Sequence, residues 1–380
     1  MRIRSSTSRW RTAILVGGAS TLLLGLLAGL AAAAPTALAD RPPPPPAQRW
    51  STMTTTNPST DNDSLFGVSC ISASFCVAVG NGSLIGVGGS FGTVAEQWNG
   101  STWSTMNTAN PPNDGALRPN DGGPFLGDTL NAVSCTSDRA CVAVGSSYNG
   151  SVNQTLAEQW NGFTWSTMNT TNRGAFDNLL NGVSCTSARA CVAVGSSYNG
   201  FVNKSLAEQW NGSRWSTMNT TNPGTNDLLG DVSCTSARAC VAVGSVGSFS
   251  DASSQTLAEQ WDGSTWSTMN TTNSGVAYNF LNGVSCSSPR TCVAVGNNNN
   301  GSANQTLAEQ WDGSTWSTMA TTNPGAADGL FRVSCTSASV CVATGQILGT
   351  PPSQTLAEIY EGSPSPPPPP PPPPGPWGPH

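Results

Sequence analysis

Hydrophobic and polar positions along this chain follow one pattern that returns about every 50 residues. Within each return, a segment such as residues 191–195 is apolar on both alternating faces, which is typical of a strand covered on both sides. The flanking segments also predict short strands, and no part of the repeat shows helical periodicity. The pattern therefore predicts an all-β protein built from one recurring unit.

The unit reads V-S-C-T-S-x-x-x-C-V-A-V-G, a variable stretch, and then T-L-A-E-Q-W-[ND]-G-x-x-W-S-T-M. It predicts four strands, which in the third unit span residues 182–185, 191–195, 206–210 and 215–218. An Asn-Gly or Asp-Gly pair between strands three and four is a strong hairpin signal. Six units cover residues 47–362, and their first cysteines are Cys70, Cys135, Cys185, Cys234, Cys286 and Cys335.

Six units of four strands predict a six-bladed β-propeller of four-stranded antiparallel blades. The sixth unit has no W-S-T-M segment, but one copy stands ahead of the first unit at residues 50–53. We therefore expect the N-terminal strand to complete the last blade, which closes a ring and removes free sheet edges. The alternative is an open β-solenoid with atypical ends.

The repeat resembles the kelch-type propeller motif, in which a hydrophobic strand ends in glycine and later strands carry an acid and two aromatic residues. Gly195, Glu208, Trp210 and Trp215 match that order. The resemblance implies the propeller fold more than a function. The chain departs from the motif because its second strand ends in one glycine and because the motif has no paired cysteines.

Each unit also contains C-x5-C, with the second cysteine opening strand two. In an oxidising compartment such pairs predict disulfides, here one within each blade. Buried free thiols and bound metal are the alternatives, but metal ligands must converge, and six separate pairs do not. The second cysteines are Cys76, Cys141, Cys191, Cys240, Cys292 and Cys341.

The ends of the chain read as targeting and spacer segments. Residues 1–39 combine four arginines, an apolar stretch and Ala37-Leu38-Ala39, which predicts a secretory signal peptide; an uncleaved membrane anchor is the alternative. A proline-rich linker at residues 40–46 and a proline-rich, disordered tail at 363–380 flank the propeller at 47–362. We expect a secreted, extracellular or wall-associated monomer with no membrane span in the mature chain.

Composition excludes several function classes. The only histidine is His380, which argues against His-dependent triads and His-ligated zinc. The net charge of −6 argues against nucleic-acid binding. A glutamate recurs in every blade and a pair of tryptophans in the first five, so we interpret both as architectural. Neither composition nor motif names a ligand.

Length changes between units fall in the loops joining strands two and three and in the linkers between blades. In a four-stranded meander these connections share one face, and variable loops on a rigid scaffold commonly bind ligands. Carboxylates there suit Ca²⁺, and aromatic and amide groups suit carbohydrate, while the same residues could simply cap turns. The candidates are Asp61, Asp63, Asp128, Tyr148, Asp177, Tyr198, Asp227, Asp231, Tyr278, Asp328 and Arg332.

The sequence favours a non-enzymatic binding or surface-interaction protein, with a glycan or a protein as ligand. One alternative is a carbohydrate-active enzyme, either a sialidase-like glycosidase or a lyase, which would need converging acids on the same face. Asp262-Gly263-Ser264-Thr265-Trp266 is similar to a sialidase Asp box, but its spacing differs by one residue. A structural envelope protein is the third possibility. No cofactor is expected, apart from a weak expectation of Ca²⁺.

Overall fold

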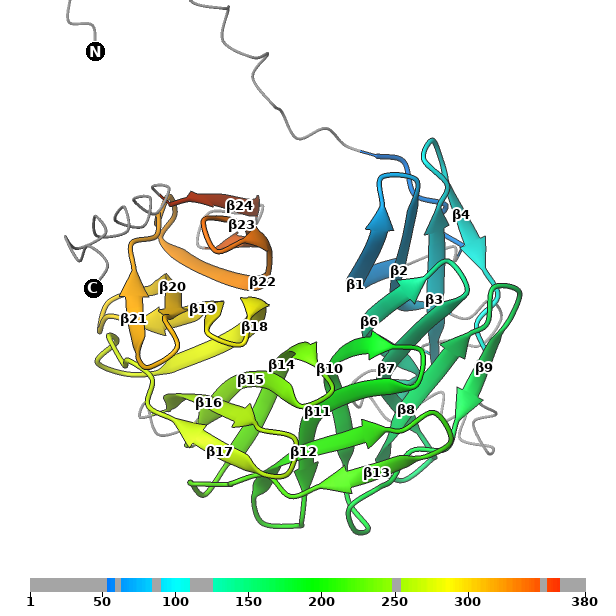
Figure 1. Cartoon of the computed structure of the whole chain (residues 1–380), viewed down its shortest axis with the longest axis horizontal. Helices are drawn as coiled ribbons and strands as arrows, with labels where there is room; N and C mark the ends of the chain where they lie inside the picture. Colours follow the sequence, from blue (N-terminus) through cyan, green and yellow to red (C-terminus); the bar gives the residue numbers. More distant parts are fainter. Residues whose placement is uncertain are drawn as a thin grey trace, which may run out of the picture. The chain divides into compact units, whose positions relative to one another are not determined.

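The computed structural model describes residues 53–58, 63–83, 90–109, 126–247, 254–348 and 354–362. These ranges hold strands and turns in six sheets, and the first strands of successive sheets lie side by side (Figure 1). The signal peptide, the proline-rich linker, the tail and residues 50–52 lie outside the described ranges. The six-bladed all-β propeller arrangement predicted from the repeat is confirmed.

Each of the first five blades contains a four-stranded antiparallel meander in chain order. The first blade has β1 (Asp63–Ser72), β2 (Phe75–Ser83), β3 (Ser90–Trp98) and β4 (Trp103–Met106), with β5 (Leu126–Gly127) added in parallel to β3. The second has β6 (Thr129–Ser137), β7 (Ala140–Tyr148), β8 (Asn153–Trp160) and β9 (Trp165–Met168). The third has β10 (Asn178–Ser187), β11 (Ala190–Tyr198), β12 (Asn203–Trp210) and β13 (Trp215–Met218).

The remaining blades repeat this order. The fourth has β14 (Asp227–Ser236), β15 (Ala239–Val246), β16 (Gln255–Trp261) and β17 (Trp266–Met269). The fifth has β18 (Asn279–Ser288), β19 (Thr291–Asn299), β20 (Asn304–Trp311) and β21 (Trp316–Met319). The sixth has β22 (Ala327–Ser337), β23 (Val340–Leu348) and β24 (Gln354–Glu361), and no fourth strand among the described residues.

In each of the first five blades the second strand, which is apolar on both faces, is buried as its sequence predicts. In β11, Val192, Ala193 and Val194 are all buried because their side chains alternate between the two faces of the sheet. One face then packs on the preceding blade and the other on the following blade. The core is therefore a series of interfaces between blades.

Each of these interfaces joins two different faces. We call the face that a blade turns toward the next blade its forward face, and the opposite one its rear face. Between the fourth and fifth blades, the forward face contributes small and medium side chains: Val241, Val243, Ala258 and Met269. The rear face contributes two leucines and two tryptophans together with smaller side chains: Leu281, Leu307, Trp311, Trp316, Val284, Cys292 and Ala294.

Hydrogen bonds also join neighbouring blades. The first cysteine of each of blades two to six donates its amide N–H to a serine hydroxyl of the preceding blade, over 2.9–3.0 Å. The acceptors are Ser69, Ser134, Ser184, Ser233 and Ser285. These hydrogen bonds hold the first strands of neighbouring blades side by side in the same register at each interface.

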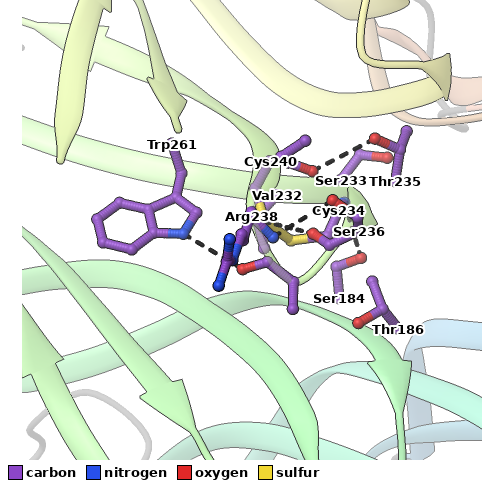
Figure 2. Close-up of a disulfide and its surroundings, with 12 residues drawn as sticks. Ser184, Thr186, Val232, Ser233, Cys234, Thr235, Ser236, Arg238, Cys240 and Trp261 are labelled. Carbon is purple, nitrogen blue, oxygen red and sulfur yellow. Dashed lines mark hydrogen bonds between the residues drawn. A yellow bond between two sulfur atoms is a disulfide. The ribbon is translucent and has the colours of Figure 1, made fainter. Parts of the chain in front are cut away.

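All six predicted disulfides are present, from Cys70–Cys76 to Cys335–Cys341. Each joins directly opposed residues of strands one and two. Figure 2 shows the Cys234–Cys240 bridge, with the Cys234 amide donating to Ser184 of the third blade. The disulfides therefore stabilise the same hairpins that link one blade to the next.

Candidate functional site

The two ends of the blades differ in construction. At one end, the hairpin between strands one and two contacts the turn between strands three and four; the Trp160 indole, for example, donates to the Asp138 carbonyl over 3.1 Å. At the other end, the loop between strands two and three contacts the linker that enters the blade, as where the Tyr198 amide donates to the Asp177 carbonyl over 2.8 Å. We call these the turn end and the loop end.

Three candidate aspartates at the loop end are buried. Asp128, Asp227 and Asp328 hold one repeat position and are only 0–2 % exposed. The Asp227 carboxylate accepts the Gly224 N–H over 3.0 Å, and Asp328 accepts the equivalent Gly325 N–H over 2.9 Å. These two carboxylates close the turn that enters their own blade, which favours the turn-capping interpretation for them.

In two other blades an asparagine at this position accepts the equivalent hydrogen bond from the entering turn. The Asn178 side-chain oxygen accepts the Arg173 N–H, and that of Asn279 accepts the Gly275 N–H. Because a neutral amide serves equally well, the position requires an acceptor and not a negative charge. The sequence contains a signal for this role, because the repeats have either Asp or Asn at this position.

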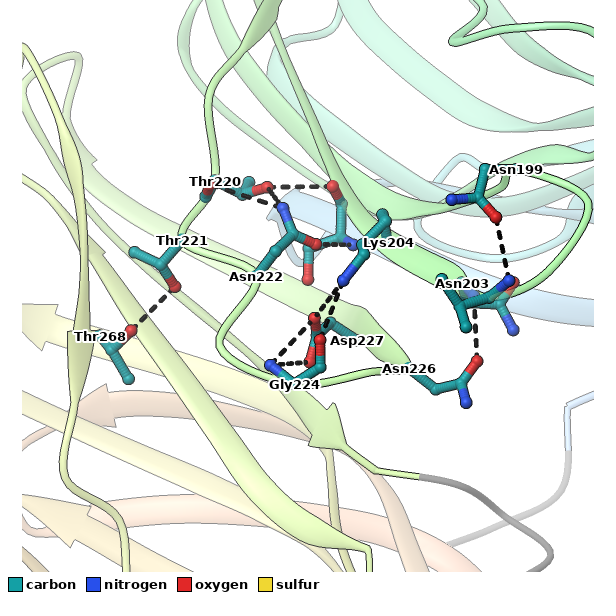
Figure 3. A network of polar contacts seen from close by, with 12 residues as sticks. Asn199, Asn203, Lys204, Thr220, Thr221, Asn222, Gly224, Asn226, Asp227 and Thr268 are labelled. Carbon is teal, nitrogen blue, oxygen red and sulfur yellow. Dashed lines mark hydrogen bonds and ion pairs between the residues drawn. The ribbon is translucent and has the colours of Figure 1, made fainter.

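The fourth blade adds the only ion pair found among the described residues. The Lys204 ammonium lies 3.5 Å from the Asp227 carboxylate and donates to the Gly224 carbonyl over 2.9 Å (Figure 3). Burial raises the pKa of Asp227, and the Lys204 charge opposes that rise. Burial likewise raises the pKa of Asp128 to about 6. These carboxylates are shielded from any ligand at the surface.

The other candidate loop-end acids that the structure describes are Asp177 and Asp63. Asp177 accepts both the backbone and the side-chain N–H of Asn153, over 2.7 and 3.2 Å. Asp63 opens β1 and is half-buried, and Asp61 lies outside the described residues. Within the described ranges, no group of three or more His, Cys, Asp or Glu side chains could hold a metal ion.

Asp231 and Arg332 interact electrostatically, and both bind backbone groups of neighbouring blades. The Arg332 guanidinium donates to the Asn282 carbonyl of the fifth blade over 3.0 Å and to the Asn181 carbonyl of the third blade over 3.5 Å. Asp231 accepts the Val284 N–H over 3.1 Å. Burial raises the pKa of Asp231, and the positive charge of Arg332 opposes that rise. Their contacts with the backbone of several blades favour an architectural role.

The three candidate tyrosines are all half-buried: Tyr148 and Tyr198 stand at equivalent places in the second and third blades, whereas Tyr278 lies in the linker that enters the fifth. The Tyr278 hydroxyl donates to the Asn304 side chain, and its ring lies 5.3 Å from that of Phe280. Tyr148 ends β7. Tyr198 ends β11 and packs edge-on against Phe176, with 5.9 Å between ring centroids.

The third blade therefore carries an aromatic cluster, which we define as Phe176, Tyr198 and Phe201. Phe176 is 45 % exposed and Phe201 89 % exposed. The Tyr198 hydroxyl donates to the Gly200 carbonyl over 2.9 Å, and the Phe201 amide donates to the Asn199 side chain. Gly200 has φ of 96°, which favours glycine and places Phe201 at the loop tip.

Sequence reasoning found Tyr198 but missed both phenylalanines. A signal for Phe201 was present, because the same loop in the second and fifth blades has Ser151 and Ser302 at that position. A large apolar residue at an exposed turn position, in one repeat only, departs from a pattern that is otherwise nearly constant. The contact with Phe176 required knowledge of how linker and loop meet.

No known family model matches the chain, and no curated protein matches its sequence. Solved structures share its fold. A protein of unknown function from Dyadobacter fermentans is 10% identical with a TM-score of 0.50, over 79% of this chain and 94% of that one. YCF48 bound to D1 peptide is 13% identical with a TM-score of 0.43, over 81% of this chain and 100% of that one.

A PL25 ulvan lyase is 10% identical with a TM-score of 0.49, over 76% of this chain and 77% of that one. Glycoside hydrolases are also among the similar structures. Similarity at this level shows the fold alone, and the kelch resemblance is not confirmed. Within the described ranges, no helix is long and apolar enough to span a bilayer.

Proposed function

We propose that this protein is an extracellular carbohydrate-binding propeller, and that the aromatic cluster of the third blade is its binding surface. The observation that carries the proposal is the pair of exposed phenylalanine rings held on a structured loop at the loop end. Solvent-exposed aromatic rings have a free-energy cost in water that a stacking ligand would remove.

The cluster is rigid enough to bind without a large loss of entropy. The Asn199 side chain accepts the N–H groups of Phe201 and Val202, over 3.0 and 2.9 Å, which fixes the turn below the tip. Phe176 is held from the linker side by its contact with Tyr198. A binding surface that is already ordered avoids part of the cost of association.

The chemistry around the cluster favours a sugar. An aromatic ring offers a flat apolar face to the C–H groups of a pyranose, and neighbouring amide groups can bond its hydroxyls. Asn199, Asn203 and Asn226 stand on the loop and linker beside the cluster, and Figure 3 shows their side chains in this region. Lys204, the nearby cation, is already paired with Asp227.

The acids of the loop end support binding more than catalysis. Glycoside hydrolysis commonly needs two carboxyl groups facing one bond, whereas Asp177, Asp227 and Asp328 each serve a separate turn. The six disulfides support an extracellular location, because such bonds persist in oxidising compartments. Secretion agrees with the signal peptide predicted at residues 1–39.

The proposal is tested by measuring affinity for a panel of neutral and acidic polysaccharides, both soluble and insoluble. We expect binding to at least one of them. Phe201→Ala and Phe176→Ala should each weaken that binding about tenfold, the equivalent of about 1.4 kcal/mol. The matched control is Phe163→Ala, because Phe163 is 77 % exposed but lies at the turn end.

Two outcomes would overturn the proposal. One is the absence of binding to every polysaccharide by a protein that unfolds cooperatively. The other is equal affinity of the wild type, Phe201→Ala and Phe176→Ala. Release of new reducing or unsaturated ends from any bound polysaccharide would instead establish the enzymatic alternative, so the same panel is analysed for products.

A further inference from the structure

The sixth blade has an unfilled cavity beside its outer strand. The space is open to solvent, its water-accessible part measures about 60 Å³, and it lies between the fifth and sixth blades. Val293, Val295, Ala308 and Met319 line it from the forward face of the fifth blade, and Tyr360 lines it from β24. Beyond β24, no further strand is paired among the described residues.

In four other blades the equivalent space is filled by the tryptophan that opens strand four. Trp165, Trp215, Trp266 and Trp316 are 3–6 % exposed, and each packs against the valines and alanine of the preceding blade. Trp316, for example, shares a cluster with Val241, Val243 and Ala258. The hydrophobic cluster of the fifth and sixth blades contains Tyr360 and no tryptophan.

We propose that this cavity is the binding site for the Trp50 indole of the same chain. Residues 50–53 repeat the W-S-T-M sequence of every other fourth strand and are the one copy without a blade. By the register of the other blades, in which Ala308 faces Met319 and Trp311 faces Trp316, Met53 would face Ala357 and Trp50 would face Tyr360.

The residues that follow this segment already occupy the expected place on the first blade. The Thr56 amide and hydroxyl donate to the Glu96 carboxylate over 3.1 and 2.7 Å. Thr221 makes the same two bonds to Glu259 at the junction of the third and fourth blades. Residues 53–57 thus contact the first blade in the way that a linker from strand four contacts the next blade.

The backbone conformation of the linker that contains Asn57 also matches that of the linker that contains Asn222. Asn57 and Asn222 are the only non-glycine residues with positive φ in the described ranges, and both have φ of 46°. They follow Thr56 and Thr221 respectively, in the same T-T-N sequence. The shared uncommon conformation shows that these two linkers have the same local backbone geometry at this position.

The two faces that would meet are both uncovered. On the rear face of the first blade, Val68 is 63 % and Leu65 39 % exposed, whereas their counterparts in the next four blades are 4–7 % and 0–1 % exposed. On the forward face of the sixth blade, Thr344 and Ala357 are exposed where other blades bury a valine and an alanine. One is a rear face and the other a forward face, which is the combination that forms each of the five interfaces between successive blades.

The chain's own segment is a better occupant than a second copy. Residue 53 is directly continuous with a linker that is bound to the first blade, so the segment is held at high effective concentration. A second copy would have to overcome that advantage at ordinary protein concentrations. The occupant we propose is therefore residues 50–53 of the same molecule.

The test uses the full chain with two introduced cysteines, Met53→Cys and Ala357→Cys. We expect an intramolecular disulfide between the new thiols, detected by peptide mapping without reduction, in a protein that remains monomeric. Ala308→Cys with Met319→Cys is the positive control, because these residues are observed partners in the fifth blade. Met53→Cys with Glu361→Cys is the control for chance oxidation, since the second site is four residues away along β24.

A disulfide in the positive control but none between positions 53 and 357 would overturn the proposal, and so would a disulfide that joins two molecules. Trp50→Ala and Trp50→Phe provide a second readout on the same full chain. We expect Trp50→Ala to lower the midpoint of thermal unfolding clearly and Trp50→Phe to lower it less. Equal midpoints for the wild type and both variants would contradict occupation of the cavity.

Discussion

One glutamate in each of the first five blades combines burial with hydrogen bonds from a linker. Glu96, Glu158, Glu208, Glu259 and Glu309 are 0–2 % exposed, and each accepts the backbone N–H of a residue in the preceding linker. Burial raises the pKa of Glu208 and of Glu309 to about 7. The interpretation of this residue as architectural agrees with those contacts.

The raised pKa predicts that the protein loses stability as the pH rises. Below about pH 4.5 these carboxyls are protonated in both states, whereas between about 4.5 and 7 only the folded state keeps the proton. The free energy of unfolding should therefore fall across this range. Glu208→Gln should reduce the fall, by on the order of 1–3 kcal/mol, in denaturant titrations at pH 5 and pH 8.

Asp138→Asn is the matched control, because Asp138 is exposed at the turn end. The fall in stability that is assigned to Glu208 should persist in this variant. A Glu208→Gln variant with the same pH dependence as the wild type would show that Glu208 titrates normally in the folded protein.

For single residues, the sequence was enough to select candidate side chains but not to predict their burial or their hydrogen-bond partners. An aspartate ahead of a strand fits a surface ligand and a turn cap equally well, and only coordinates show that Asp227 is fully buried against Gly224. Phe201 could have been found by comparing repeats. Phe176 could not, because its role depends on a contact across 22 residues with Tyr198.

At the scale of the element, the hairpin between strands one and two combines several constraints. In the fourth blade the disulfide Cys234–Cys240 closes it, the Arg238 amide donates to Ser236, and the Trp261 indole donates to the Ala237 carbonyl (Figure 2). The C-x5-C spacing was sufficient to predict this pairing, because it brackets a tight turn between adjacent strands.

Removing one such bridge should cost measurable stability. Closing a seven-residue loop contributes about 2 kcal/mol by restricting the unfolded chain. The double variant Cys234→Ala/Cys240→Ala should lose about that much free energy of unfolding in urea titrations. Ser236→Ala, in the same hairpin, is the control and should lose far less; a double variant as stable as the wild type would contradict the role of the bridge.

At the scale of the whole molecule, one interface is repeated between successive blades. The repeat count, the strand order and the six disulfides followed from the sequence because each depends on spacing within one unit. Contacts between distant units did not. Arg332 of the sixth blade reaches the Asn181 carbonyl of the third, and no local pattern around either residue indicates that meeting.

The central claim is that the same interface is used a sixth time, with residues 50–53 completing the last blade. Hydrogen exchange of the unmodified protein tests it most directly. If the strand is in place, both edges of β24 are paired, and amides of Gln354–Glu361 should exchange as slowly as those of Asn304–Trp311 in β20. Rapid exchange of about half the β24 amides, with β20 fully protected, would show an unpaired edge and contradict the claim.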